Sequence, residues 1–502
     1  MNYTSPPARC WHEQTNERTS FLAGKPQRSH RHNTMSDPQK PTILVTGSSG
    51  HLGKALMLAL PSYGYDPVGI DVLPSSTTTA VGSVADPGFV RDVFARYRPE
   101  HVVHAATLHK PHVGTHGWAE FCEVNVKGTA VLLEAVRETR TGLSLSLSLS
   151  SSSLSSSSSS SSLSSAAAAA ASASASASSA ASSSSAAAAA AAEAARAVPD
   201  GRGSIVPVRA FIFVSTTSAF GHALAPPPKR PAALISESVA PRPKNIYGVT
   251  KTAAEDLCKL AHDQTGLPVV ALRVARFFPE EDDAKNDLRG DKAGDGRATM
   301  EGDNLKVLEL AYRRVDIADV VGACVAAVER AGEVGWGRYV VSAPSPFLRA
   351  SRAGGDHDDG GGGGGGRKDT GDKEADGEMR AQQNEEEEEE EEEEENRLLA
   401  ALGGGDVERA YDWAVPGIRD VFARKGWRFL RRVDRVYDSR RAERELGWRA
   451  EYTIARAVDK IARGEEWRSD LALRVGTLGY HAVPTGVYTT KARGADETGP
   501  RA

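Results

Sequence analysis

The segment "TILVTGSSGHLGKALMLAL", residues 42–60, constrains the fold more than any other part of the chain. An apolar β-branched run comes first, three glycines follow in the spacing G-x-x-G-x-x-G, and leucines beginning at Leu52 then recur on one helical face. This order predicts a strand, a tight turn and a helix. Gly47 suits the turn, Gly50 lets backbone approach a pyrophosphate, and Gly53 lets the helix pack close to the strand. The helix N-terminus adds free N–H groups and a positive dipole end.

Two further strands are predicted after this motif. The first, "DPVGID", ends in Asp71, about 20 residues after the glycines, where an acid would bind the adenosine ribose hydroxyls of NAD and repel the phosphate of NADP. The alternative is that Asp71 caps a turn or a helix. The second, "HVVHAAT", residues 101–107, has the small residues expected where backbone passes a dinucleotide, and we interpret His104 as structural rather than catalytic.

The stretch "NIYGVTK" places Tyr247 and Lys251 four residues apart, so a helix would put both side chains on one face. A positive charge near a phenol favours the phenolate and would make Tyr247 a proton donor and acceptor near neutral pH. On its own, the pair is better explained as an ordinary surface contact on a helix, and such a pair also occurs by chance in a chain of this length.

Two low-complexity stretches interrupt the ordinary sequence. Residues 142–197 are almost entirely Ser, Ala and Leu, and residues 350–397 contain a polyglycine tract and the unbroken run Glu385 to Glu395. Neither has the aromatic and β-branched content that offsets the entropy of ordering, so both are predicted to be disordered insertions, with a helix possible in the alanine-rich part. The predicted organisation is a disordered leader at 1–40, a dinucleotide-binding domain at 41–349 interrupted at 142–197, the second insertion at 350–397, a C-terminal substrate-domain segment at 398–491 and a disordered tail at 492–502.

Charge and cysteine usage exclude several classes of protein. The formal charge of −5 arises in the acidic insertion, so the rest of the chain is net positive, which suits an anionic small ligand. No basic run with interleaved aromatics is present, so we expect no nucleic-acid partner. Four widely spaced cysteines argue against a zinc site or a disulfide framework and fit a reducing compartment, and no metal is expected. The chain has no apolar run of about 18 residues, so no membrane span is predicted. The leader lacks a hydrophobic region, so a cytoplasmic location is expected, with organellar targeting as the alternative.

In this order, the glycines, Asp71, "HAAT" and "YGVTK" resemble the extended short-chain dehydrogenase/reductases of the NAD-dependent epimerase/dehydratase family, of the UDP-glucose 4-epimerase kind. Further similar motifs are "NVKGT" at 125–129, "FIFVSTTSAFG" at 211–221 and "YDSRRAERELGW" at 437–448. The resemblance implies an α/β fold with a doubly wound parallel sheet of Rossmann type that binds NAD(P), a smaller, mostly C-terminal substrate-binding part, and a homodimer. Asp71 favours NAD over NADP as the cofactor.

The resemblance also implies roles for single residues. Thr216 occupies the catalytic Ser/Thr position, with Ser215 as the neighbouring candidate. Tyr247 would move the proton of a sugar oxygen, and Lys251 would bind the nicotinamide ribose and lower the pKa of Tyr247. The predicted cofactor-binding residues are Gly47, Gly50, Leu52, Gly53, Asp71, Ser83, Val84, Ala105, Ala106, Thr107, Asn125, Tyr247 and Lys251.

The match is weaker where the family binds its substrate. A family motif with a substrate-contacting asparagine reads "LRVARFFPEEDD" here, with Arg276 near that place, and Tyr312 stands where a phosphate-binding arginine is expected, followed by Arg313 and Arg314. The three arginines could clamp a phosphate or carboxylate, or each could be a solvated surface residue. In "LGYHAVPTGVYTTK", near the end of the C-terminal segment, His481 is interpreted as structural.

Three functions remain open from the sequence. The first is an epimerase or dehydratase that acts on a nucleotide sugar by transient hydride transfer. The second is a net NAD(P)-dependent oxidoreductase of a hydroxy or keto substrate, and the third is a non-catalytic dinucleotide sensor. The paired Tyr247 and Lys251 argue against the sensor, since binding alone needs neither group.

Overall fold

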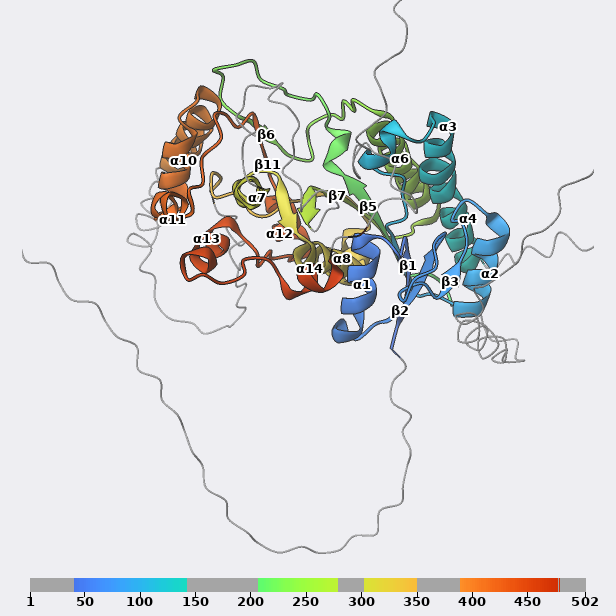
Figure 1. The fold of residues 1–502 in the computed structure, drawn as a ribbon. Helices are drawn as coiled ribbons and strands as arrows, with labels where there is room; N and C mark the ends of the chain where they lie inside the picture. Colours follow the sequence, from blue (N-terminus) through green and yellow to red (C-terminus); the bar gives the residue numbers. More distant parts are fainter. Residues whose placement is uncertain (1–39, 142–205, 279–301, 350–388, 477, 479–502) are drawn as a thin grey trace, which may run out of the picture. The chain divides into compact units, whose positions relative to one another are not determined.

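A computed structural model describes residues 40–141, 206–278, 302–349, 389–476 and 478 (Figure 1). The predicted leader, the serine- and alanine-rich insertion, most of the acidic insertion, His481 and the tail lie outside the described residues, as does Cys10. The described end of the acidic insertion, residues 389–397, is helical and continues as helix to residue 404.

The centre of the fold is a seven-stranded sheet in which every pairing is parallel. Its order is β10-β7-β5-β4-β1-β2-β3, so the chain starts in the middle and winds outward in both directions. The prediction of a doubly wound parallel sheet is therefore confirmed. The strands are β1 (Thr42–Thr46), β2 (Asp66–Asp71), β3 (Ala80–Val81), β4 (His101–His104), β5 (Ala210–Thr216), β7 (Val269–Val274) and β10 (Trp336–Val341).

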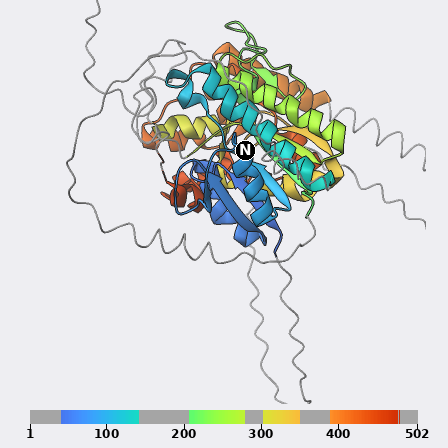
Figure 2. The ribbon, with the colours of Figure 1, turned by 90° about the vertical axis from the view of Figure 1, so that its right-hand side faces the viewer.

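Alternate residues of the central strands enter two separate cores. Val45 and Val103 join one cluster, with side chains of α1 (His51–Ala59) and α8 (Ile317–Val334). Leu44 and Val102 face the other, which is covered by α2, α4 and α6. Because both faces of the sheet are covered, its strands are continuously apolar rather than alternating. Figure 2 shows α4 and α6 side by side on their face. The helices of this second layer are α2 (Pro87–Tyr97), α4 (Gly128–Thr141) and α6 (Ile246–Thr265).

A smaller part is assembled from segments that lie far apart in the chain. Two short parallel pairs, β6 with β11 and β8 with β9, join residues after β5 and β7 to later segments. Their bounds are β6 (Ala233–Ile235), β8 (Arg276–Phe278), β9 (Arg314–Asp316) and β11 (Arg435–Tyr437). The accompanying helices are α7 (Gly302–Leu310), α10 (Val407–Ala414), α11 (Ile418–Lys425), α12 (Arg440–Leu446), α13 (Ile454–Ala462) and α14 (Asp470–Val475). Short helical turns complete the described chain at η1 (Leu60–Tyr63), η2 (Lys110–Gly114), α3 (Trp118–Phe121), η3 (Cys122–Lys127) and η4 (Thr217–Ala219).

Helix α8 connects the C-terminal segment to the sheet. The buried carboxylate of Asp319 accepts hydrogen bonds from the backbone N–H groups of Glu451 and Tyr452, at 2.8 and 3.0 Å. The indole of Trp448 donates to the Asp319 carbonyl, and Asp316 accepts from both the backbone and the hydroxyl of Ser469. The motif "ELGW" therefore anchors the C-terminal segment to α8. Within the described part of the chain, no helix is both long and apolar enough to cross a membrane.

Candidate active site

The glycine-rich turn between β1 and α1 has the geometry that the sequence predicts. Gly47 has φ +75°, and a Cβ there would lie 2.8 Å from backbone atoms of Ala106. A Cβ on Gly53 would lie 1.9 Å from the Gly47 carbonyl oxygen, so only glycine lets α1 begin this close to the turn. Gly50 is the N-cap of α1 in an extended conformation and has more space. The turn could hold the diphosphate of a dinucleotide against the N-terminus of α1.

Asp71 ends β2 beside this turn. Its carboxylate accepts hydrogen bonds from the backbone N–H groups of Ser49, at 3.0 Å, and Leu73, at 2.9 Å. Both interpretations of Asp71 thus have a basis in the structure, because the side chain organises a turn and lies at the glycine-rich loop. Its partial exposure leaves it accessible to a ribose.

The other predicted cofactor-binding residues follow the neighbouring strands. Ala105, Ala106 and Thr107 form the exit of β4, where the Ala106 backbone N–H donates to Thr46 Oγ1. Ser83 and Val84 lie in the turn after β3, and Val84 packs close to Gly128 at the start of α4. Because the carboxyl ends of parallel strands meet at one edge, these loops border the same side of the sheet as Gly47.

Asn125 joins the β4 exit loop to helix α6. It lies in the π-helical turn η3, is 2% exposed, and its amide contacts Thr107, both backbone groups of Leu108, and Thr250 Oγ1. Irregular turns of this kind are frequent at functional sites. These hydrogen bonds hold the β4 exit loop to α6.

Thr216 and Tyr247 meet where the end of β5 approaches the start of α6. The Thr216 side chain acts on the Tyr247 phenol and lowers its pKa, and the tyrosine is 9% exposed. Ser215 instead donates from its hydroxyl to Glu255, at 2.5 Å. Of the two candidates that the sequence left open, Thr216 is therefore the one in contact with Tyr247.

Lys251 lies one turn further along α6 and is 1% exposed. Its ammonium lies 3.9 Å from the centroid of the Phe213 ring, a cation–π contact that orients the side chain. Burial lowers the pKa of Lys251 from 10.5 to about 7, although nearby Cys258 and Glu255 act in the opposite direction.

The expected lowering of the Tyr247 pKa is not found. Burial raises the pKa of Tyr247 from 10.0 to about 12, and the Thr216 side chain only partly offsets this. The prediction was wrong because it considered the charge of Lys251 and not the loss of water around the phenol, which disfavours the phenolate. Burial likewise disfavours the ammonium form of Lys251 and so lowers its pKa.

His104 has the structural role that the sequence analysis assigned to it. It is 1% exposed, and its two ring nitrogens contact Thr46 Oγ1, at 2.7 Å, and Thr129 Oγ1, at 3.0 Å. Burial, with a further contribution from Lys251, holds its pKa well below 6.5. A neutral imidazole with both nitrogens bonded stabilises the sheet edge under the site.

The three predicted substrate-binding arginines gather on one buried carboxylate. Glu309, at the end of α7, is 0% exposed and accepts hydrogen bonds from Arg313 and Arg314, while Arg276 Nη1 lies 3.9 Å from it. Arg314 is itself buried, so for this residue the alternative of a solvated surface position is wrong. Tyr312, which stands where the family has a phosphate-binding arginine, is fully buried.

Sequence reasoning missed a second buried carboxylate, Glu255. It lies four residues after Lys251 on the same helix and forms a bidentate contact with Arg273 on β7. Its spacing from Lys251 is a signal that could have been read from the sequence, whereas Arg273 is identifiable only once β7 lies beside β5. Among described residues, no group of three histidine, cysteine or acidic side chains could hold a metal ion.

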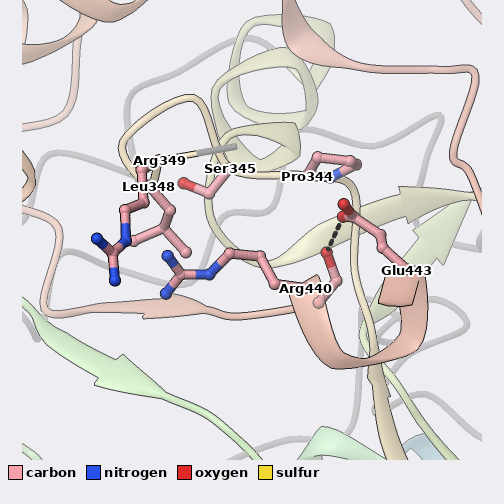
Figure 3. Close-up of a pocket in the computed structure, with 7 residues that line it drawn as sticks. Pro344, Ser345, Leu348, Arg349, Arg440 and Glu443 are labelled. Carbon is pink, nitrogen blue, oxygen red and sulfur yellow. Dashed lines mark hydrogen bonds between the residues drawn. The ribbon is translucent and has the colours of Figure 1, made fainter. Parts of the chain in front are cut away.

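A small pocket with a cavity volume of about 50 Å³ lies at the β10 exit loop, away from the predicted residues. Arg349 and Arg440 point to the same side of it, and Glu443 lies at its other side (Figure 3). The Ser439 hydroxyl donates to the Glu443 carboxylate at 3.1 Å. Arg440 is bound by the Asp438 and Glu395 carboxylates. The pocket is lined by Pro344, Ser345, Leu348, Arg349, Ser439, Arg440 and Glu443.

Together, the wound sheet, the glycine-rich turn and the Thr216, Tyr247 and Lys251 group define a protein of the extended short-chain dehydrogenase/reductase class. A family model described as "NAD dependent epimerase/dehydratase family" matches residues 43–165 and 162–341, more than half of the chain. The chain belongs to this family.

Individual relatives match over shorter stretches. The chain is 32% identical over 111 residues to a UDP-glucose 4-epimerase of Erwinia amylovora, covering 19% of this chain and 33% of the relative. It is 34% identical over 104 residues to the UDP-glucose 4-epimerase of Rhizobium meliloti, covering 19% of this chain and 32% of the relative. The matches thus span about a third of the length of these curated relatives.

Among solved structures, one similar chain is a short-chain dehydrogenase/reductase superfamily protein from Agrobacterium tumefaciens with bound NAD. It has 16% identity and a TM-score of 0.43, and covers 84% of this chain and 96% of that chain. A UDP-glucose 4-epimerase from Thermotoga maritima with UDP-glucose has 20% identity and a TM-score of 0.35, and the match covers 60% of this chain and 76% of that chain.

Proposed function

We propose that the protein is an NAD-dependent epimerase or dehydratase that acts on a nucleotide sugar by transient hydride transfer. The observation that carries this proposal is the contact between Thr216 and Tyr247 beside the buried Lys251. A buried phenol, hydroxyl and amine at the end of a strand serve proton transfer, whereas dinucleotide binding alone does not require them.

The residues of the glycine-rich edge fit NAD. The positive φ of Gly47 and the close packing of Gly53 give the tight turn that a diphosphate-binding loop at the start of α1 requires. Asp71 carries a negative charge at the end of β2, which favours ribose hydroxyls and disfavours the 2′-phosphate of NADP. When bound, NAD supplies a nicotinamide carbon that can accept a hydride from the sugar and return it.

Side chains of the protein transfer the proton of the reacting sugar oxygen. Thr216 donates or accepts a hydrogen bond at the reacting sugar oxygen, and Tyr247 removes and returns the proton of that oxygen. Because burial raises the pKa of Tyr247 to about 12, the phenol holds its proton near neutral pH and can give it to the reacting oxygen. Lys251 would bind the nicotinamide ribose.

The substrate is the least constrained part of the proposal. A nucleotide sugar is supported by the names of the relatives, three of which are UDP-glucose 4-epimerases, although they match over only about a third of their length. Arg276 and Arg313, each about a quarter exposed, remain the predicted contacts to an anionic group. Arg314 is a weaker candidate because it is buried on Glu309.

A second candidate function is a net NAD(P)-dependent oxidoreductase of a hydroxy or keto compound. The specific observation in its favour is the fully buried Tyr312 at the position of a family phosphate-binding arginine. Such an enzyme would use the same Thr216, Tyr247 and Lys251 but would release the altered cofactor after each turnover.

The test is to denature the purified protein and identify released small molecules by mass spectrometry. Bound NAD, above all together with a nucleotide sugar, supports a cofactor that is recycled in place. A pocket that binds added NAD(H) or NADP(H) reversibly favours the oxidoreductase. Dinucleotide binding without turnover of any tested nucleotide sugar, hydroxy or keto compound would favour the sensor, and absence of dinucleotide binding would contradict all three.

From the family resemblance we propose a homodimer. From the cysteine usage and the leader we propose a cytoplasmic location, with organellar targeting as the alternative, and from the composition no nucleic-acid or membrane partner. Light scattering of the full chain as it leaves a size-exclusion column measures the mass of the assembly directly. A monomer at micromolar concentration would contradict the proposed dimer and leave the proposed chemistry unchanged.

A further inference from the structure

Two contacts connect β5 to α6 near the site, and only one of them involves the proposed catalytic group. The last residue of β5, Thr216, lies close enough to Tyr247 in the first turn of α6 to act on its phenol. The residue before it, Ser215, donates to Glu255 two turns further along the same helix, at 2.5 Å. The end of the strand is therefore held to the helix at two separated points.

Glu255 is held by several partners. It is 0% exposed, and Arg273 Nη2 donates to its Oε2 at 2.8 Å, while Arg273 Nε lies 3.1 Å from its Oε1. Arg338 on β10 lies 3.1 Å from the same carboxylate and also contacts Asp256. A carboxylate with partners on β5, β7 and β10 cannot shift without breaking several charged contacts.

This arrangement acts on the position of Thr216. Neighbouring residues of a strand share one rigid backbone, so fixing the Ser215 hydroxyl on Glu255 also fixes the Thr216 Cα relative to α6. The cost of a displacement at a reacting group is high, since about 1 Å of misplacement can reduce a rate by about 100-fold.

We propose that Glu255 is a positioning residue of the site, which holds Thr216 opposite Tyr247 through its hydrogen bond with Ser215. The inference deepens the proposed function and rests on it for its kinetic consequences. Glu255 touches no reacting atom in this scheme and acts only through the strand end. Its negative charge near Lys251 additionally favours the ammonium form of that side chain.

The kinetic test is Ser215→Ala with Ser469→Ala as a matched control. Ser469 also donates to a buried carboxylate at 2.5 Å, that of Asp316, but between α8 and α14. We expect Ser215→Ala to lower kcat about tenfold or more with KM and dinucleotide Kd unchanged. Ser469→Ala should leave kcat unchanged. Equal kcat values for both variants would overturn the proposal.

A second measurement does not depend on turnover. In a double-mutant cycle on urea unfolding, Ser215→Ala should reduce the destabilisation caused by Tyr247→Phe, because the Thr216 contact is already loosened. The same cycle with Ser469→Ala should be additive, as for distant sites. Additivity in both cycles would refute the positioning role. If the wild-type protein turns over no substrate, the proposed function fails while this cycle still decides the inference.

Discussion

At the scale of single residues, Tyr247 carries the most specific expectation. Tyr247→Phe should lower turnover by at least about 100-fold, the usual range for loss of a general acid–base group. Dinucleotide affinity should change little, because the ring stays and only the oxygen goes. Steady-state kinetics and a fluorescence titration with NAD measure the two effects.

A matched control for this variant is Tyr411→Phe. Tyr411 donates a buried hydrogen bond of 2.7 Å to the Leu308 carbonyl and is not part of the Thr216, Tyr247 and Lys251 group. Its loss should cost stability but leave kcat of the folded protein unchanged. Near-normal turnover of Tyr247→Phe would show that another group moves the proton.

Lys251 makes a prediction on pH and stability. Its pKa in the folded protein is about 7, below the ordinary 10.5, so its contribution to stability is present above pH 10.5 and is lost as the pH falls through 7. Relative to Lys251→Met, which does not titrate, the wild-type protein should therefore lose stability between pH 10 and 7. The slope is at most about 1.4 kcal/mol per pH unit.

Urea unfolding across this pH range, with Lys259→Met as a control, measures the effect. Lys259 lies on the same helix and pairs with Asp263 on its exposed face. A difference between wild type and Lys251→Met that does not vary with pH would mean that the amine stays charged in the folded protein.

At the scale of elements, the turn between β1 and α1 depends on Gly53. In Gly53→Ala the added methyl would lie 1.9 Å from the Gly47 carbonyl oxygen, so α1 must move away from the turn. We expect a loss of about 1–3 kcal/mol in unfolding free energy, as for overpacked sites, and weaker dinucleotide binding.

The control for this element is Gly332→Ala in α8. A Cβ there meets nothing within 4 Å, so the substitution should stabilise the helix by about 0.5–1 kcal/mol and leave binding unchanged. Chemical denaturation and NAD titration of both variants separate crowding from helix propensity. Equal behaviour of the two variants would show that the turn tolerates a side chain at Gly53.

The elements also show which features the sequence could predict. The strand, turn and helix around Gly47 were predictable because hydrophobic period and glycine spacing are local signals. The choice between Ser215 and Thr216 was not, since it depends on how β5 lies against α6. Likewise, the carboxylates of Glu255 and Glu309 take partners from other strands, and burial, which sets the pKa of Tyr247, exists only after the layers pack.

At the scale of the whole molecule, Asp319 couples the sheet to the C-terminal segment. Burial raises the pKa of Asp319 from 3.8 to about 7, although two backbone N–H groups act in the opposite direction. A folded pKa above the unfolded value means that the contribution to stability is fully present below pH 3.8 and is lost as the pH rises through 7.

Asp319→Asn should therefore gain stability relative to the wild type as the pH rises from 4 to 7. The amide stays neutral in both states, whereas the carboxyl ionises readily in the unfolded chain and is disfavoured as a charge in the folded protein. A constant offset is expected as well, since the amide has one oxygen where two backbone groups of the C-terminal segment donate. Urea unfolding of both proteins at several pH values gives the difference. If that difference stays constant or changes in the opposite direction, the two N–H donors outweigh burial, and the C-terminal segment is held to α8 by an ionised carboxylate throughout.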